Sequence, residues 1–378
     1  MKLLVISHTE HYKDISGNIV GLASTVTELN HLLDLFDEIY HIGVLYNTPA
    51  PGNTLPYQSD KVTFVPIKPS GGKQLKDKLS IVFQAPENLL KVNKYLAKVD
   101  CFQFRAPTGM GVYMIPYLSF FTRKRGWFKY AGNWKQESAP KGYALQRWML
   151  KKQSRYVTVN GKWADAPSHC IPFENPSLSI ENRCEGEKSL TKKASKKPFN
   201  LCFVGRLEDA KGVDKILQAF AELSEEERAT FKIHFIGNGA QEETYRQAVK
   251  KENLPVTFYG SLPQKEVFEQ YKKCDFLLLP SKSEGFPKVI GEAMNFGCIP
   301  ITSNVSSIGQ YVKDGENGFL IAPNTAEELK HIFKRILKAE TALLQQMIFA
   351  NYRLAAKFTY ANYIDRIKYE LLADSIAG

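Results

Sequence analysis

Residues 199–223 read FNLCFVGRLEDAKGVDKILQAFAEL, and this stretch decides the fold class. Its first six residues form a continuous apolar run, which is typical of a strand buried on both faces of a parallel sheet. A turn bounded by Gly205 and Gly212 follows, and from Val213 onward apolar residues recur at helical spacing. The order of strand, turn and helix repeats along the rest of the second half. The sequence therefore predicts a doubly wound α/β sheet, whose ligands bind at the carboxyl ends of its strands.

The same patterns divide the chain into two domains, as its length of 378 residues also suggests. In the second half, further strands are expected at 232–236, 256–259, 276–279, 299–302 and 318–321, and helices at 213–223, 240–251, 264–273, 288–296 and 325–338. In the first half, strands are expected at 2–7, 38–44, 62–66 and 100–104, with a polar loop up to Gly17 and a helix over 18–33. We expect a Rossmann-like domain over 1–180, a polar linker over 181–198 and a second Rossmann-like domain over 199–354. The closing helix, about 355–378, is expected to pack back on the first domain.

The composition is that of an ordinary globular protein, with 44% hydrophobic and 24% charged residues. The longest apolar run, 109–121, contains Pro116 and is shorter than the ~18 residues that span a bilayer. Only residues 3–6 are apolar near the N-terminus, so no signal peptide is expected and we predict a cytoplasmic location. The six cysteines form no CxxC pair, and neither HExxH nor Asp-x-Asp occurs. We therefore expect reduced thiols and no metal site.

One stretch accounts for the net charge of +11, because residues 101–162 hold twelve Lys or Arg against a single acid, Glu137. Within it, residues 123–130 (RKRGWFKY) mix cations with aromatic side chains. The segment could bind an anionic membrane surface, bind nucleic acid, or form a solvated loop next to a buried helix. No RRM, KH or helix-turn-helix signature accompanies it. We expect the membrane interpretation and no nucleic-acid partner.

The turn after the strand at 199–204 carries two cations, Arg206 and Lys211, beside the start of a helix. The N-terminus of a helix favours anions, so this arrangement suits a diphosphate. The alternative is a strand–helix loop with two solvated charges.

A second motif, residues 280–294 (PSKSEGFPKVIGEAM), holds Glu284 and, eight residues later, Glu292. Pro287 suits the first position of the following helix. The N–H groups near residues 286–289 could hold phosphate oxygens, and the two carboxylates could accept hydrogen bonds from sugar hydroxyls. The alternative is an acidic residue that stabilises the helix dipole and a solvated glutamate inside the helix.

On these two motifs, residues 199–337 resemble the retaining GT-B glycosyltransferases of family 4, with their GR…KG element and their E-x7-E signature. The resemblance implies the GT-B fold, in which two Rossmann-like domains face a cleft. It also implies a catalytic set of Arg206 and Lys211 on the donor diphosphate and Glu284 on the donor sugar, while Glu292 binds the ribose. The other donor-binding positions that it implies are Gly17, Gly205, Gly260, Ser261, Gly285, Phe286, Pro287, Lys288 and Val289.

The first half departs from the family pattern. Gly17 is a single glycine where the family usually has a glycine-rich loop, and residues 102–107 (FQFRAP) lack the histidine that many members carry. Arg105 could take a polar role there or be an ordinary surface arginine. His8 and His11, which follow the first strand, are further candidates.

The resemblance thus implies a metal-independent hexosyl- or N-acetylhexosaminyl-transferase that needs no cofactor and uses a UDP- or GDP-linked sugar. We expect a saccharide or polyprenyl-linked acceptor at the inner face of a bacterial membrane, in lipopolysaccharide, capsule or exopolysaccharide synthesis. Two alternatives remain open. A GT-B-fold sugar-nucleotide epimerase would need no acceptor, and a non-catalytic sugar-nucleotide-binding scaffold would only bind.

Overall fold

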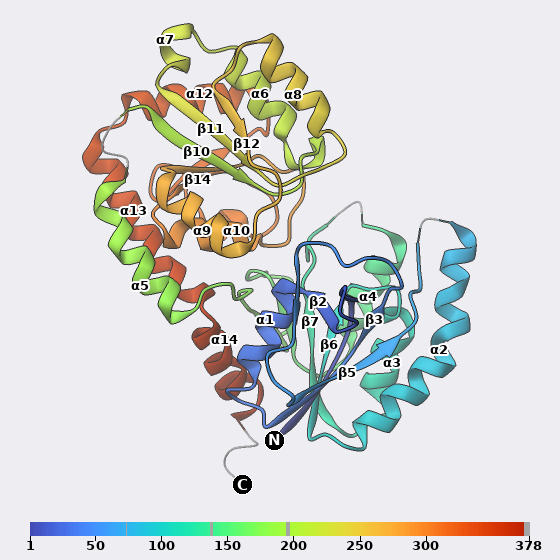
Figure 1. Cartoon of the computed structure of the whole chain (residues 1–378). Helices are drawn as coiled ribbons and strands as arrows, with labels where there is room; N and C mark the ends of the chain where they lie inside the picture. Colours follow the sequence, from blue (N-terminus) through green and yellow to red (C-terminus); the bar gives the residue numbers. More distant parts are fainter. Residues whose placement is uncertain (73, 137–138, 194–196, 374–378) are drawn as a thin grey trace. The chain divides into compact units, whose positions relative to one another are not determined.

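A computed structural model describes residues 1–72, 74–136, 139–193 and 197–373 of the chain (Figure 1). The chain forms two compact units, and each contains its own sheet and core. Unit 1 comprises residues 1–175 and the described residues from Tyr360 onward, whereas unit 2 comprises residues 176–359. Both ends of the chain therefore belong to unit 1.

Unit 2 contains a six-stranded, fully parallel sheet in the order β12-β11-β10-β13-β14-β15. Its strands are β10 (Phe199–Val204), β11 (Phe231–Ile236), β12 (Val256–Phe258), β13 (Phe276–Leu279), β14 (Ile299–Ser303) and β15 (Phe319–Ile321). The strand order changes direction between β10 and β13, which is where doubly wound sheets bind ligands. The predicted doubly wound sheet is confirmed.

Helices cover both faces of this sheet. They are α5 (Ile180–Ser189), α6 (Val213–Ala221), α7 (Glu225–Arg228), α8 (Glu242–Lys251), α9 (Gln264–Lys273), α10 (Lys288–Asn295), α11 (Ile308–Tyr311), α12 (Ala326–Lys338) and α13 (Thr341–Ala355). On one side α6 packs against α8 and α12, and on the other α10 packs against α9 and α13. One large apolar core lies between these layers.

The polar segment 181–198 is not a linker, and that prediction is wrong for its first part. Residues 180–189 form α5, which begins at the capping residue Ser179 and packs against α10. Gly186 makes this possible, since a Cβ there would lie 2.3 Å from the carbonyl oxygen of Asn295. The Arg183 guanidinium also donates to the Asn295 side chain at 2.7 Å. Polar contacts rather than an apolar stripe hold this helix, so its sequence shows little periodicity. Residues 194–196 lie outside the described residues.

Unit 1 is built on a nine-stranded sheet whose parallel part runs β5-β3-β1-β6-β7-β8-β9, while β2 pairs antiparallel with β1 and β4 pairs antiparallel with β2. The strands are β1 (Lys2–Lys13), β2 (Ile19–Leu22), β3 (Glu38–Leu45), β4 (Thr54–Pro56), β5 (Val62–Ile67), β6 (Cys101–Ala106), β7 (Arg125–Tyr130), β8 (Val157–Val159) and β9 (Cys170–Pro172). The helices are α1 (Ala23–Leu32), α2 (Leu75–Leu96), α3 (Gly111–Phe120), α4 (Lys141–Lys152) and α14 (Tyr360–Arg366), which a π-helical turn (Ile367–Leu371) continues. Helices α1 and α14 cover one face and α2, α3 and α4 the other.

The polar loop expected up to Gly17 is largely absent. Strand β1 continues to Lys13 and turns back into β2, so that His11 pairs with Gly21 across an antiparallel ladder. The helix expected over 18–33 correspondingly begins only at Ala23. A bulge between Ile6 and Glu10 breaks the simple alternation of side chains, which explains why the strand looks like a loop in the sequence.

The segment 123–130 is not a membrane-surface element. Residues 125–130 form β7, an interior strand between β6 and β8. Trp127 and Phe128, which would insert into lipid, are buried in the two cores of unit 1. Lys129 is buried as well. Within the described residues, none of the helices is both long and apolar enough to cross a bilayer.

Candidate functional site

Three glycines lie side by side at the carboxyl ends of β10, β11 and β12. The Gly237 N–H donates to the Gly260 carbonyl at 2.7 Å, and the Gly205 N–H donates to the Ile236 carbonyl at 3.0 Å. A Cβ on Gly237, whose φ is +134°, would lie 1.9 Å from the Gly205 carbonyl oxygen. Only glycine fits there. The edge of the sheet is therefore lined by bare backbone, which a ligand can approach closely.

The loop after β10 leads from Gly205 into a single 3₁₀ turn (Asp209–Lys211) and then into α6. Gly212 joins the two with a φ of +79°, and a Cβ there would lie 2.3 Å from the Pro280 carbonyl oxygen. The Lys282 N–H donates to the Ala210 carbonyl at 2.9 Å. These contacts hold the loop after β10 against the loop after β13, so the two sequence motifs meet.

The meeting point of the two motifs is an ion pair. The Lys211 Nζ lies 2.5 Å from the Glu284 Oε1, and these side chains are only 22% and 11% exposed. An ammonium group has three donors, so Lys211 can bind an anion while it keeps Glu284. The pair therefore fixes a cation and a carboxylate next to each other at the edge of the sheet.

Arg206 behaves differently from Lys211. Its side chain is 73% exposed and lies 3.2 Å from Glu208. An exposed pair of this kind contributes little to stability, so the guanidinium is able to leave Glu208 for a stronger anion.

The second motif leads into α10, which begins at Lys288. The sequence predicts Pro287 at the first position of this helix. In the structure Pro287 is instead the capping residue before the helix, because its ψ of 128° is extended. The Phe286 ring stacks on Phe358, 4.9 Å between centroids, and is buried in the core. Val289 packs against the same core, and the Gly285 carbonyl accepts a hydrogen bond from the Ser307 hydroxyl. The start of the helix is thus rigidly anchored.

Glu292 lies inside α10 and is buried, with Gln264 donating to it at 3.3 Å. Burial raises the pKa of Glu292 to about 7, although the positive charge of Lys288 and the bond from Gln264 oppose this shift. Glu292 is therefore not the solvated residue that one interpretation of the sequence allowed. A buried carboxyl with a raised pKa is typical of a functional site.

Gly260 and Ser261 follow β12 on the same edge of the sheet as Gly205 and Gly237. Gly260 has a φ of +69° with open space where a Cβ would point, and Ser261 is exposed. They lie at the rim of the site and not in its floor.

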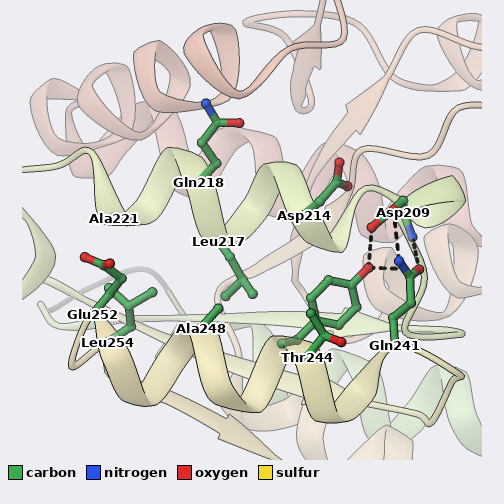
Figure 2. A pocket seen from close by; sticks show the side chains of 11 residues that line it. Asp209, Asp214, Leu217, Gln218, Ala221, Gln241, Thr244, Ala248, Glu252 and Leu254 are labelled. Atoms are coloured by element: carbon green, nitrogen blue, oxygen red, sulfur yellow. Dashed lines mark hydrogen bonds between the residues drawn. The ribbon is translucent and has the colours of Figure 1, made fainter.

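A pocket of about 460 Å³ lies between α6 and α8, beside the loop that carries Lys211 (Figure 2). At its end next to that loop, the Asp209 carboxylate accepts hydrogen bonds from the Tyr245 hydroxyl at 2.7 Å and from the Gln241 amide at 2.9 Å. The Gln241 side chain in turn accepts from the Asp209 N–H. These bonds lower the pKa of Asp209. This cluster cannot be predicted from the sequence, because Gln241 and Tyr245 stand 32 and 36 residues after Asp209.

The remaining candidates lie in unit 1. Gly17, at the tip of the β1–β2 hairpin, has a φ of +83° and touches nothing where a Cβ would point. His8 hydrogen-bonds the Ser70 carbonyl at 3.2 Å. His11 is fully buried, and burial lowers its pKa to about 4.

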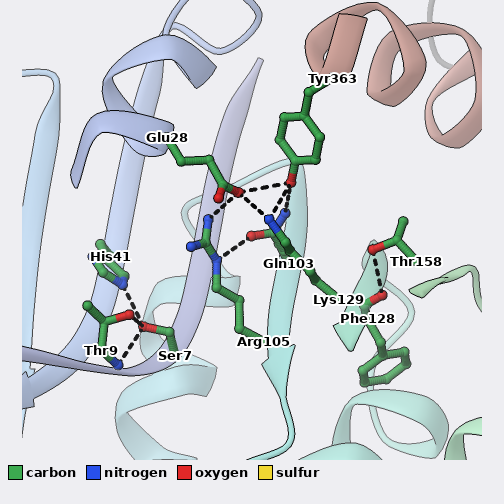
Figure 3. Close-up of polar contacts among 10 residues, drawn as sticks. All are labelled: Ser7, Thr9, Glu28, His41, Gln103, Arg105, Phe128, Lys129, Thr158 and Tyr363. Atoms are coloured by element: carbon green, nitrogen blue, oxygen red, sulfur yellow. Dashed lines mark hydrogen bonds and ion pairs between the residues drawn. The ribbon is translucent and has the colours of Figure 1, made fainter. Parts of the chain in front are cut away.

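Arg105 is not an ordinary surface arginine. It lies 2.9 Å from Glu28, which Lys129 also contacts at 2.7 Å and Tyr363 at 3.0 Å (Figure 3). Gln103 accepts a further hydrogen bond from the Arg105 Nε at 2.7 Å. Two cations and one carboxylate are therefore buried together under α1 and α14. Within the described ranges, no group of three or more His, Cys, Asp or Glu could hold a metal ion.

Two doubly wound α/β units define the fold class, which is GT-B as expected. Residues 187–353 match the family model of the glycosyl transferases group 1.

Several similar proteins are named as glycosyltransferases. The chain is 32% identical over 139 residues to the uncharacterized glycosyltransferase MJ1178 of Methanocaldococcus jannaschii, covering 36% of this chain and 38% of that protein. It is 31% identical over 160 residues to the lipopolysaccharide 1,6-galactosyltransferase of Salmonella typhimurium, covering 40% of this chain and 43% of that protein. The matches thus span less than half of these relatives.

Likeness in structure extends over the whole chain. It is similar to the crystal structure of Anabaena Alr3699/HepE in complex with UDP-glucose, with a TM-score of 0.69 and 17% identity, covering 99% of this chain and all of that one (100%). At this identity the likeness establishes the fold.

Proposed function

We propose that the chain is a retaining, family 4 glycosyltransferase that moves a sugar from a nucleotide-sugar donor to a saccharide or lipid-linked saccharide. The observation that carries the proposal is the Lys211–Glu284 pair, held at the glycine-lined edge of the sheet. It lies within the region that matches the group 1 glycosyl transferases. Complexes of HepE with UDP-glucose support a nucleoside diphosphate sugar as the donor class.

In this proposal the donor diphosphate lies against Lys211 and Arg206. Lys211 is already held in place by Glu284, whereas Arg206 exchanges its exposed contact with Glu208 for the diphosphate. The start of α10, which follows the cap Pro287, adds the N–H groups of Lys288 and Val289, and such helix N–H groups favour phosphate. The bare backbone at Gly205 and Gly285 lets the phosphates approach closely.

The two glutamates would bind hydroxyl groups and not phosphate. Glu284 accepts hydrogen bonds from the donor sugar, and Glu292 accepts them from the ribose. Gly260 and Ser261, at the rim, lie near the base. Because Glu292 is buried beside a glutamine, it can discriminate a ribose hydroxyl by hydrogen bonding without exposure to water.

In the proposed reaction, the bond between the anomeric carbon and the diphosphate breaks on the face where the bond to the acceptor oxygen forms. The acceptor hydroxyl proton passes to a leaving phosphate oxygen. Arg206 and Lys211 stabilise the charge that develops on the diphosphate, so that neither a metal ion nor another cofactor is required. Losing one preorganised group of this kind typically costs roughly 10²–10³ in rate.

The proposed acceptor is a saccharide of a bacterial cell-surface polysaccharide, made at the cytoplasmic face of the membrane. The similarity to a lipopolysaccharide galactosyltransferase supports this pathway. A hexosyl or N-acetylhexosaminyl donor, linked to UDP or GDP, is consistent with it.

The first experiment is a thermal-shift screen of UDP- and GDP-linked sugars, because a ligand of the native state raises its melting temperature. The donor so found is then incubated, radiolabelled, with the protein and bacterial lipid extract in EDTA. Label in the lipid or saccharide fraction supports the proposal. A new nucleotide sugar without acceptor would instead identify an epimerase, and binding without turnover would identify a scaffold.

Variants assign the roles. We expect Lys211→Ala to lower kcat by roughly 10²–10³, and Glu292→Gln to weaken donor binding without destabilising the fold. Lys215→Ala, which removes a cation of α6 that is not a member of the ion pair, is the matched control. Equal losses in Lys215→Ala and Lys211→Ala would contradict the proposed site.

A further inference from the structure

Arg105 carries hydrogen-bond donors that unit 1 does not use. A guanidinium group has five N–H donors. The Arg105 Nε donates to Gln103 at 2.7 Å, and Nη2 donates one hydrogen to Glu28 at 2.9 Å. Among the described residues, the other terminal nitrogen, Nη1, has no hydrogen-bond partner, and no dashed line reaches it in Figure 3. Three N–H donors of a charged group are therefore available to a ligand.

The positive charge of Arg105 is only partly balanced by its neighbours. Its side chain is 13% exposed, and its partner Glu28 is 4% exposed. The same oxygen of Glu28, Oε1, also accepts hydrogen bonds from Lys129 at 2.7 Å and from Tyr363 at 3.0 Å, so two cations share it. Glu28 is the only acid in the sequence of α1. Because a buried charge is costly unless it is fully paired, an anion from outside would stabilise this arrangement.

Arg105 lies at the edge of the sheet where doubly wound sheets bind ligands. It is the last residue but one of β6 and is paired in register with Lys129 of β7. The parallel strands follow the chain outward as β1, β3, β5 on one side and as β6, β7, β8, β9 on the other. The strand order therefore changes direction between β1 and β6, and ligands bind beyond the carboxyl ends of the strands at such a point. Solvent reaches Nη1 there, because it is not one of the fully buried unpartnered atoms of the described chain.

We propose that Arg105 forms an oxyanion site in unit 1, which binds a carboxylate or a phosphate group. A planar guanidinium matches the geometry of both groups. In this site Arg105 contacts the anion, whereas Lys129 and Glu28 set the net charge around it. A substituent of a saccharide and a free ion both supply this chemistry, and the experiment separates them. The proposal does not depend on the glycosyl transfer or on the diphosphate site of unit 2.

The test uses the full chain and measures unit 1 alone. The four tryptophans of the chain all lie in unit 1, so urea unfolding followed by their fluorescence does not report on anions bound to unit 2. A ligand of native unit 1 raises the unfolding midpoint with its concentration, which gives its Kd. The probes are inorganic phosphate, glucose 6-phosphate and glucuronate, with glucose as the neutral probe. Each anion is compared with sodium chloride at equal ionic strength, because salts by themselves change stability.

We expect the anions to raise the midpoint and glucose to leave it unchanged. Arg105→Gln should weaken anion binding by roughly 10–100-fold, because charge-assisted hydrogen bonds are lost. This variant should still fold, since Glu28 keeps its contacts with Lys129 and Tyr363. Arg105→Lys, which keeps the charge without the planar fork, should bind with intermediate affinity. The matched control is Arg123→Gln, which changes an exposed arginine just before β7, at the opposite edge of the sheet, and should bind like the wild type.

Glu28→Gln distinguishes anion binding from a purely structural role of Arg105. It removes the internal negative charge, so unit 1 should be less stable in chloride, yet its affinity for the anions should rise by at least about tenfold. Binding of glucose 6-phosphate or glucuronate at least as tight as that of phosphate assigns the site to a saccharide, and binding of phosphate alone assigns it to a free ion. Midpoint shifts that are equal in the wild type and in Arg105→Gln, or no shift with any of the three anions, would overturn the proposal.

Discussion

At the scale of single residues, the proposed role of Glu292 favours its charged form, whereas its burial favours the neutral form. A carboxylate is the better partner for a ribose hydroxyl, yet burial raises its pKa to about 7, so that near neutral pH a large fraction is protonated without ligand. Between the ordinary value of 4.5 and about 7, the native state holds a proton that the unfolded chain has released. The stability of unit 2 therefore falls as the pH rises through this window.

Glu292→Gln should remove this penalty, because glutamine resembles the protonated acid. We expect the variant to be more stable than the wild type at pH 8, by up to about 3 kcal/mol, and equal to it within about 1 kcal/mol at pH 5. Hydrogen exchange of the amides in β10 and β13 measures the stability of unit 2. Parallel pH profiles of the two proteins would show that Glu292 is not buried as a neutral acid.

A second set of residues forms a buried hydrogen-bonded chain on β1 and β3. His11 Nδ1 contacts the Thr9 carbonyl at 3.0 Å, which only accepts, so this nitrogen carries the proton and Nε2 accepts from the Tyr57 hydroxyl at 2.8 Å. Tyr57 must then accept from His41 Nδ1 at 2.6 Å. His41 Nε2 in turn accepts from Ser7 at 2.7 Å, a contact drawn in Figure 3. Both histidines are therefore neutral in the same tautomer.

Tyr57→Phe should break this chain at its centre. It leaves His11 Nε2 without a donor and His41 Nδ1–H without an acceptor in buried positions, at a cost of roughly 2–4 kcal/mol. Urea unfolding followed by tryptophan fluorescence measures this loss. Tyr46→Phe is the control, because in the described part of the chain the Tyr46 hydroxyl has no hydrogen-bond partner, and its expected cost is under about 0.5 kcal/mol. Equal costs would refute the hydrogen-bond assignment.

At the scale of elements, the loop that carries Lys211 is tied to α8 through Asp209. The Tyr245 hydroxyl and the Gln241 amide hold the Asp209 carboxylate, two residues before Lys211. These hydrogen bonds reach Asp209 and not the Lys211–Glu284 pair itself. Tyr245 and Gln241 therefore act on the pair indirectly, as positioning residues. They fix the 3₁₀ turn, and the turn fixes the direction of Lys211.

Tyr245→Phe should therefore affect donor binding more than folding. We expect donor affinity to fall several-fold, with a KM increase larger than the change in kcat, while the melting temperature moves by no more than a few degrees. Thr244→Val, an exposed change in the wall of the same pocket, is the control and should leave affinity unchanged. If Thr244→Val weakened donor binding as much as Tyr245→Phe, the pocket and not the Asp209 contact would be responsible.

The elements also show which parts of the structure the sequence could predict. In unit 2 the strands at 199–204 and 276–279 and the helix at 264–273 have the predicted bounds, because each apolar pattern is local and complete. Strand β7 was misjudged for the opposite reason. Its Lys129 is buried and pairs there with Glu28, which stands 101 residues earlier in the sequence. A partner that distant leaves no trace in the local pattern.

The candidate site divides in the same way. Lys211 and Glu284 were predicted because each stands in a motif of its own, and the close fit of Gly212 against Pro280 then brings the motifs together. The contact of Asp209 with Tyr245 was not predicted, because neither residue belongs to a pattern that points to the other. Glycine positions in a turn are readable from the sequence, whereas single polar contacts between elements are not.

At the scale of the whole molecule, the two units should respond to acid in opposite ways. Burial lowers the pKa of His11 and His41, so from pH 6.5 downward the unfolded chain binds protons that native unit 1 does not. Through His11, whose pKa is lowered to about 4, unit 1 should lose up to about 1.4 kcal/mol per pH unit as the pH falls below 6.5, and the lowered pKa of His41 adds to this loss. Unit 2 gains stability from Glu292 over much of the same range.

All four tryptophans lie in unit 1, so their fluorescence reports its unfolding alone. We expect this transition to move to lower urea concentration as the pH falls from 6.5 to 4.5. Over the same pH range, the stability of unit 2 obtained from amide exchange in β10 and β13 should not fall. A common shift of both units would show that the buried histidines and Glu292 do not dominate the pH dependence.

Unit 1 is also completed by the last part of the chain. Tyr363, Ile367, Leu371 and Leu372 are buried in the core that α1 and β7 share. The Tyr363 hydroxyl also donates to Glu28 at 3.0 Å, and its ring lies 4.7 Å from the Lys129 ammonium. Residues 360–372 therefore contribute both apolar burial and a hydrogen bond to the buried Glu28 in a unit that otherwise ends at residue 175.

Truncation after Thr359 should consequently unfold unit 1 and leave unit 2 folded. Removing four buried side chains costs roughly 10 kcal/mol, which is comparable to the whole stability of a typical domain, and it opens the Glu28 cluster to water. We expect the tryptophan emission to shift to that of exposed indole and the unit 1 transition to disappear, while β10 and β13 stay protected from exchange. A chain ending at Ala373, which keeps all four side chains, is the control and should behave like the full chain. A cooperative tryptophan transition in the shorter chain would show that unit 1 folds without its C-terminal segment.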